Sequence, residues 1–139
     1  MPVVMFQVPE AVSSDEAAQS ITRAACELLG QVLEAPSDRI RAYMTTLPNT
    51  HVCAGGDVVS ASGVPAPFYQ FFVLADRSAV QVSALHEGFA ALLAEHLKID
   101  RSIIRGTCIR ISPDDWAIAG KPASEIRKAE LDKRKEEAS

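Results

Sequence analysis

Residues 67–78, PFYQFFVLADRS, place a proline, a short apolar strand and the start of a helix in direct succession. Residues 68–74 are rich in aromatic and aliphatic side chains, which is typical of a buried strand. Ser78 and Gln81 have the spacing of a capping box, which marks the first turn of a helix. An apolar stripe follows at helical spacing and consists of Val82, Leu85, Phe89, Leu92, Leu93 and His96. With residues 103–111 (IIRGTCIRI) as a second strand, the stretch predicts a β-α-β unit.

The first half of the chain carries the same signals in the same order. Residues 3–8 (VVMFQV) have the composition of a strand, Ser13 and Glu16 have capping-box spacing, and Pro36 ends the helix that follows. Residues 39–46 (RIRAYMTT) form the second predicted strand. Its alternation sends two sets of residues to opposite faces, namely Ile40, Ala42 and Met44, and Arg39, Arg41, Tyr43 and Thr45.

Landmarks of the two halves recur at a nearly constant offset, which indicates internal duplication. The offset is 65 for Pro2 and Pro67, and 64 for Arg41 and Arg105, Gly56 and Gly120, and Ser60 and Ser124. We expect one domain over 1–139, with repeats at 2–66 and 67–128. A helical tail over 122–139 alternates acids and bases and favours i,i+4 pairs such as Glu130 with Arg134. We expect this tail to be a solvated helix or an arm across a neighbouring subunit.

The duplication predicts an α/β (α+β) fold in which tandem β-α-β units share a four-stranded mixed sheet. Parallel strands joined by right-handed helical crossovers put both helices on one face of that sheet. The opposite face then lacks a cover, which predicts that three chains pack their sheets around an axis as a homotrimer.

Composition excludes several classes of partner. The chain has 139 residues and a net charge of −4, so no basic excess is present to neutralise nucleic acid or an anionic membrane. No segment resembles a signal peptide, and no apolar run reaches the roughly 18 residues that span a bilayer. We therefore expect a cytoplasmic protein that binds neither nucleic acid nor a membrane.

The three cysteines lack C-x-x-C spacing, so we expect them to be reduced core residues and expect no metal site: Cys26, Cys53 and Cys108.

Nearly the whole of 2–128 resembles the tautomerase superfamily, which includes 4-oxalocrotonate tautomerase, malonate semialdehyde decarboxylase, the haloacrylate dehalogenases and macrophage migration inhibitory factor. Residues 67–78 are similar to the opening strand and helix entry of 4-oxalocrotonate tautomerase. Residues 103–128 (IIRGTCIRISPDDWAIAGKPASEIRK) are similar to its closing half, and 39–60 (RIRAYMTTLPNTHVCAGGDVVS) repeat that pattern. The resemblance implies a cofactor-free enzyme that acts on a small carboxylate.

The resemblance also implies roles for individual residues. Pro2 is the catalytic acid/base, and Arg77 binds a substrate carboxylate. Either Arg41 or Arg105 polarises the carbonyl or enolate oxygen, and Trp116 forms an aromatic wall of the site.

Further candidates come from the likeness to malonate semialdehyde decarboxylase, in which an aspartate assists decarboxylation. Asp38 lies in a matching Asp-Arg pair, and Arg39 and Tyr43 are additional candidates for substrate binding. The sequence departs from the family pattern at Val12, where the tautomerase has its first helix-entry arginine. It departs again at Ala75, where the decarboxylase and the dehalogenases have another arginine.

Three hypotheses follow. The first is a tautomerase or isomerase acting on a 2-hydroxydienoate or a phenylpyruvate-like enol acid. The second is a decarboxylase, hydratase or dehalogenase acting on a three-carbon acid, and the third is a non-catalytic trimeric binding protein.

The tautomerase hypothesis requires the removal of Met1, because only a terminal proline has a basic nitrogen. An ordinary α-amino group titrates near 7.7–8.0 and a secondary proline amine higher, so its pKa must be lowered. A guanidinium roughly 7 Å away disfavours the ammonium by about 2 kcal/mol at an effective dielectric of about 20.

Overall fold

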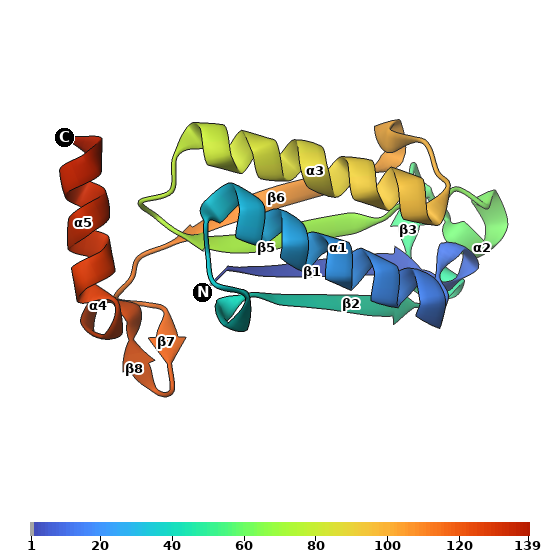
Figure 1. Ribbon diagram of the computed structural model, residues 1–139. Coiled ribbons are helices and arrows are strands. Elements are labelled where there is room, and N and C mark those ends of the chain that lie inside the picture. The colour runs from blue at the N-terminus through green and yellow to red at the C-terminus, as the bar shows by residue number, and fades with distance from the viewer. Residues whose placement is uncertain (1) are drawn as a thin grey trace.

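The computed structural model describes residues 2–139 and contains one four-stranded sheet with two long helices on one of its faces (Figure 1). The strand order is β2-β1-β5-β6. The main elements are β1 (Val3–Pro9), α1 (Asp15–Leu33), β2 (Arg41–Leu47), β5 (Phe68–Leu74), α3 (Ala79–Leu97) and β6 (Arg105–Ile111). The 3-10 turns are η1 (Glu10–Val12), η2 (Ser37–Arg39), η3 (Asn49–His51) and η4 (Arg101–Ile103). The predicted mixed sheet with both helices on one face is thus confirmed.

Strand pairing places the two prolines at opposite ends of the sheet. β1 runs parallel to β2, with Val3 opposite Arg41, and β5 runs parallel to β6, with Phe68 opposite Arg105. The central pair β1 and β5 is antiparallel, with Val3 opposite Phe72. Pro2 therefore lies beside the end of β5, whereas Pro67 lies before the start of β5, at the opposite end of the sheet.

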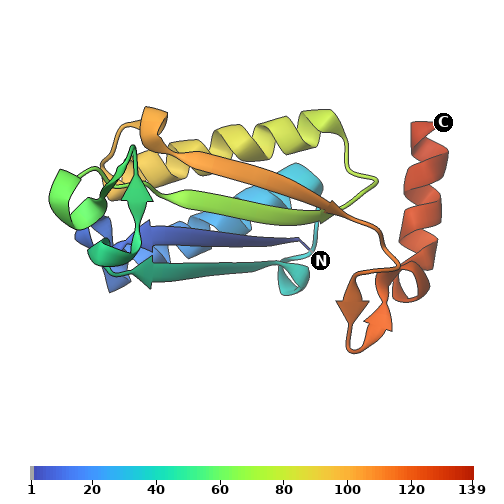
Figure 2. The same ribbon diagram turned by 180° about the vertical axis from the view of Figure 1, so that it is seen from behind.

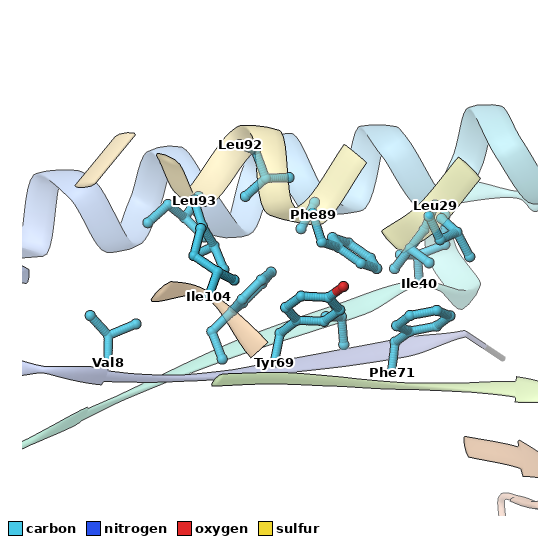
Figure 3. Close-up of a cluster of buried hydrophobic side chains, with 14 of the residues drawn as sticks. Val8, Leu29, Ile40, Tyr69, Phe71, Phe89, Leu92, Leu93 and Ile104 are labelled. Carbon is cyan, nitrogen blue, oxygen red and sulfur yellow. The ribbon is translucent and has the colours of Figure 1, made fainter. Parts of the chain in front are cut away.

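The core fills the space between the sheet and the two helices (Figure 3). Phe89 of α3 packs its ring against Phe6 of β1 and Phe71 of β5, at centroid distances of 5.8 and 5.2 Å. Leu29 of α1 and Ile40, which directly precedes β2, join the same cluster. Complete burial of side chains of this size contributes about 1.5–3 kcal/mol each, so this layer holds both repeats together.

The helix starts follow local capping chemistry. Ser78 and Gln81 form the predicted capping box at α3. The prediction for α1 is wrong by one residue, because Ser14 is the N-cap and its hydroxyl accepts from the Ala17 amide. Ser13 instead hydrogen-bonds through its hydroxyl to Thr46.

Each repeat continues into a small hairpin and a short helix. The first set is β3 (Cys53–Ala54), β4 (Asp57–Val58) and α2 (Val59–Ser62), and the second is β7 (Ala117–Ile118), β8 (Lys121–Pro122) and α4 (Ala123–Ile126). The turn of each hairpin contains two residues with positive φ, as is typical of the mirror-image (primed) hairpin turns. Gly56 has φ +91° and Gly120 has φ +82°, which explains why glycine recurs at this offset.

The chain ends in α5 (Lys128–Ala138), which stands across the end of the sheet where β1 begins (Figure 1). Leu131 is buried against Leu74 and Ala123, and Trp116 packs on the same cluster. The two ion pairs within the helix are Lys128 with Asp132 and Lys133 with Glu137. The predicted pair of Glu130 with Arg134 does not form, because both side chains reach to other elements. The tail contacts its own chain rather than only solvent.

The sheet face opposite the helices is open along most of its length (Figure 2). Tyr43 of β2 is 52% exposed there, while Ala42 and Met44 pack toward the core, as the predicted alternation requires. Cys53 is exposed, so the prediction of three core cysteines is wrong for that residue. Within residues 2–139, no helix is both long and apolar enough to cross a bilayer.

Candidate active site

A cavity of about 380 Å³ lies where β1 begins and β5 ends, between the end of α1 and the face of α5. Its lining combines apolar residues with an excess of cationic side chains. Five cations and three acids line it, which leaves a balance of two positive charges: Arg39, Arg77, Arg127, Lys133 and Arg134 against Glu34, Glu130 and Glu137. A cavity of this size and charge suits a small organic anion.

Pro2 is buried in the wall of this cavity. It directly precedes β1, and its carbonyl oxygen accepts a hydrogen bond from the Arg41 amide at 3.2 Å. The parallel pairing of β1 with β2 therefore fixes the position of the proline at the edge of the core. Met1 lies outside the described residues.

Arg77 lines the cavity from the loop between β5 and α3. Its Nη1 donates to the Leu33 carbonyl at 2.9 Å, which satisfies an end carbonyl of α1 and engages one of the five guanidinium donors. Burial lowers the pKa of Arg77 below its ordinary value, and the neighbouring charge of Arg134 adds to this effect. A partly desolvated guanidinium binds a carboxylate more strongly than one in bulk water.

Arg110 of β6 supports the same loop and was not among the candidates. Its Nη1 donates to the carbonyl of Arg77 and, at 3.4 Å, to that of Ala75. This contact fixes the backbone that presents Arg77 to the cavity.

Arg39 forms a two-pronged ion pair with Glu130 of α5, with N–O distances of 2.8 and 2.9 Å. The hydrogen bonds from Arg39 lower the pKa of Glu130 and raise that of Arg39 itself. A second ion pair joins Arg134 of α5 to Asp76, which neighbours Arg77. The two pairs connect α5 to both repeats across the cavity.

The other sequence candidates lie around the cavity rather than in it. Arg41 and Tyr43 are exposed on the edge strand β2, and Asp38 is exposed in the turn before it. Trp116 is half-buried behind the end of β5, with its ring centroid 6.5 Å from that of Phe72. Arg105 lies at the opposite end of the sheet beside Pro67, where its Nη1 donates to the carbonyls of Ser102 and Ile104. Within one chain, the cavity brings together Pro2, Arg77 and Arg39 of the candidates.

The tail also contributes to the cavity lining, although its sequence does not predict this role. Arg127, Glu130, Lys133, Arg134 and Glu137 all line the cavity. Their alternating charges are equally typical of a solvated helix, so no local signal distinguishes the two roles. Among residues 2–139, no group of three or more His, Cys, Asp or Glu side chains is arranged to hold a metal ion.

The fold and the cavity are those of a tandem β-α-β protein that has a proline directly before its first strand. Arginine side chains line the same cavity as that proline. No protein-family model matches the chain. Over 60 residues, the chain is 32% identical to 2-hydroxymuconate tautomerase of Pseudomonas putida, which covers 43% of this chain and 94% of that protein.

Solved structures extend the similarity to the whole fold. Native fused 4-OT has a TM-score of 0.82 at 23% identity, over 90% of this chain and 98% of its own. A wild-type fused 4-OT that forms an asymmetric trimer has a TM-score of 0.80 at 21% identity, over 89% of this chain and 98% of its own. The chain belongs to the tautomerase superfamily, in its fused 4-oxalocrotonate tautomerase-like form.

Docking of α5 is expected to depend on pH through Glu130. Because the folded pKa of Glu130 is lowered, its contribution to stability is present above the ordinary glutamate value of about 4.3 and is lost as the pH falls through the lowered value. Glu130 is 42% exposed, so the pair contributes only about 0.5–1 kcal/mol. We expect acidification to change the fluorescence of Trp116, the single tryptophan, which packs beside Leu131.

The variant Glu130→Gln isolates this effect. It should show, at neutral pH, part of the fluorescence change that acid causes in the parent protein, and little further change in the window below about pH 4.3. Asp132→Gln serves as the matched control, since Asp132 pairs only within α5. Identical acid transitions in the parent protein and in Glu130→Gln would show that this ion pair does not hold the tail.

Proposed function

We propose that the protein is a cofactor-free tautomerase that transfers a proton between oxygen and carbon of a small enol acid, such as a 2-hydroxydienoate or a phenylpyruvate-like acid. The observation that carries this proposal is the burial of Pro2 in the wall of a cavity whose lining has an excess of guanidinium groups. The similarity to 2-hydroxymuconate tautomerase supports the same reaction class.

The proposed reaction needs one group that accepts a proton from the substrate hydroxyl and returns it to a carbon. The nitrogen of Pro2 can do this once Met1 is removed, because the nitrogen then has a free electron pair. Arg77 would hold the substrate carboxylate, and the positive charge of the lining would stabilise the dienolate that forms when the hydroxyl loses its proton.

The same charges would keep part of the amine unprotonated. An ammonium group among guanidinium groups is disfavoured, and burial disfavours it further. Both effects lower the pKa of a terminal amine toward neutrality, where a general base is most effective. The cluster would therefore act in binding, in proton transfer and in stabilising the intermediate.

We also propose that the site is completed in a homotrimer. The related fused 4-OT proteins are described as trimers. β2 and β6 are the edge strands of the sheet, so Arg41, Tyr43 and Arg105 are placed where a neighbouring subunit could use them. A neighbour's strand arginine would then polarise the substrate oxygen, and Trp116 would form a wall of the assembled site.

The decarboxylase alternative depends on Asp38, which is exposed and is not part of the cavity lining. The acidic residues that do line the cavity include Glu130, which is already paired with Arg39. No contact in the described residues favours this second reaction over the first.

The direct test measures ketonisation of 2-hydroxymuconate and decarboxylation of malonate semialdehyde by the same preparation. The intact mass of that preparation shows whether Met1 is absent. We expect the species without Met1 to catalyse the first reaction at least 100-fold faster, in kcat/KM, than the second. Decarboxylation as the dominant activity would contradict the proposal, and so would the absence of both activities in a preparation without Met1.

A further inference from the structure

The loop that presents Arg77 to the cavity is held by a side chain from the neighbouring strand. Residues 75–78 join β5 to α3, and Arg110 of β6 reaches across to them. The Nη1 atom of Arg110 donates to the carbonyls of Ala75 and Arg77. The first carbonyl that α3 uses as an acceptor is that of its N-cap, Ser78. Arg110 therefore binds two carbonyls that belong to neither the strand nor the helix.

No other contact accounts for the guanidinium group of Arg110. The residue is exposed, and within residues 2–139 it forms no ion pair with a carboxylate. It is also absent from the lining of the cavity, so a ligand there would contact Arg77 but not Arg110. Any effect of Arg110 on binding within one chain must therefore pass through the loop.

The first repeat has a matching strand position. Thr46 lies opposite Val8 in the pairing of β1 with β2, and Arg110 lies opposite Val73 in the pairing of β5 with β6. The offset between Thr46 and Arg110 is the same 64 residues that relates Arg41 to Arg105. The two repeats can therefore be compared at this position.

The matching side chains both contact the loop after the first strand of their repeat. Thr46 hydrogen-bonds through its hydroxyl to Ser13 at 2.9 Å, a contact between two short side chains. The loop of the first repeat has Val12 where the second has Arg77, and Val12 packs against the core. The long cationic side chain thus occurs in the repeat whose loop presents a cavity arginine.

We propose that Arg110 is a positioning residue for carboxylate binding, because it fixes the loop in the conformation that aims the guanidinium group of Arg77 into the cavity. A two-pronged contact with a carboxylate depends on the direction of the planar guanidinium group. A binding residue on a loop needs supporting contacts to hold that direction. This inference rests on the proposed function, in which Arg77 binds the substrate carboxylate.

A double-mutant cycle tests whether Arg110 acts through Arg77. NMR titration with sorbate, a six-carbon dienoate with one carboxylate, measures weak as well as tight binding at pH 7 and needs no turnover. Arg110→Met keeps an unbranched side chain without donors and should lower the affinity about fivefold, as for the loss of one hydrogen bond. In the Arg77→Ala background, the same substitution should change the affinity by less than about 1.5-fold, because no guanidinium group remains to be positioned.

Three further measurements separate positioning from charge and from general destabilisation. Arg110→Lys keeps the charge and can donate to one carbonyl, so it should recover part of the loss. At about 0.5 M NaCl, where the Debye length is about 4 Å, the loss in Arg110→Met should persist, whereas a long-range attraction of the ligand by an exposed charge would be screened. Thr46→Val removes the matching contact of the first repeat and should leave the affinity within about twofold of the parent value.

Circular dichroism verifies that each variant is folded, and Arg110→Gln takes the place of Arg110→Met should the latter not fold. Equal losses in the parent and Arg77→Ala backgrounds would overturn the proposal, and so would a loss that disappears at high salt. Absence of sorbate binding by the parent protein would overturn it together with the binding role of Arg77. The expected cycle without any tautomerase turnover would uphold the role of Arg110 while contradicting the proposed reaction.

Discussion

Replacing Pro2 by alanine is expected to lower kcat/KM for ketonisation of 2-hydroxymuconate about 100-fold or more while the fold is retained. General acid–base catalysis contributes about 10²–10⁴-fold, and it depends on the position of the group as much as on its pKa. The pyrrolidine ring fixes the direction of the nitrogen, whereas the primary amine of alanine rotates freely. Pro2 is buried in the cavity wall but directly precedes β1 and is not part of the main core cluster, so the loss of its ring should leave the fold intact.

The repeat offers a matched control for this substitution. Pro67 corresponds to Pro2 at an offset of 65 but has an internal peptide nitrogen with no basic lone pair. Pro67→Ala should therefore keep kcat/KM within about threefold of the parent value. Both variants must be compared after intact mass has verified the state of Met1. Full activity of Pro2→Ala would remove the proline from the mechanism.

Arg77→Ala is expected to have the second large effect, a loss of about 100-fold in kcat/KM that is expressed mainly as a higher KM. Removal of a charged hydrogen bond to a substrate carboxylate costs about 1.5–3 kcal/mol, and a two-pronged contact costs more. The substitution also leaves the Leu33 carbonyl without its donor, so we expect a loss of about 1–3 kcal/mol in the free energy of unfolding. Steady-state kinetics and urea denaturation measure the two effects separately.

Two further variants distinguish binding from a purely structural role of Arg77. Arg77→Lys keeps a positive charge that can reach the cavity but lacks the planar guanidinium group. It should therefore recover part of the loss in KM without restoring a two-pronged contact with the carboxylate. Arg101→Ala removes an arginine paired with Glu87, outside the cavity lining, and should leave KM unchanged. A loss of stability in Arg77→Ala without a change in KM would mean that Arg77 only terminates α1.

Much of the fold is readable from local sequence, because the repeated signals are strong. Residues 68–74 form β5 with the predicted bounds, and the Ser78–Gln81 capping box forms as expected. The start of α1 was misplaced because two adjacent serines compete for the N-cap. A tertiary contact between Ser13 and Thr46 decides between them.

The site was only partly predictable, for two physical reasons. Pro2 and Arg77 were identified by the resemblance, and the antiparallel pairing of β1 with β5 brings them to one cavity. The contributions of Arg127 and Glu130 depend on how α5 folds back over the end of the sheet, which charge alternation alone does not specify. Arg105 lies at the opposite end of the same sheet, so any role at Pro2 depends on a second subunit.

The proposed mechanism requires the nitrogen of Pro2 to be a free secondary amine with a lowered pKa. Nitrogen-15 NMR of protein labelled at proline, recorded over a pH series, measures this property, because amine and amide nitrogens have distinct chemical shifts. We predict a titrating amine signal whose pKa lies below the ordinary α-amino range of about 7.7–8.0. A Pro2 signal at the amide position, or an amine that titrates above that range, would contradict the proposed mechanism.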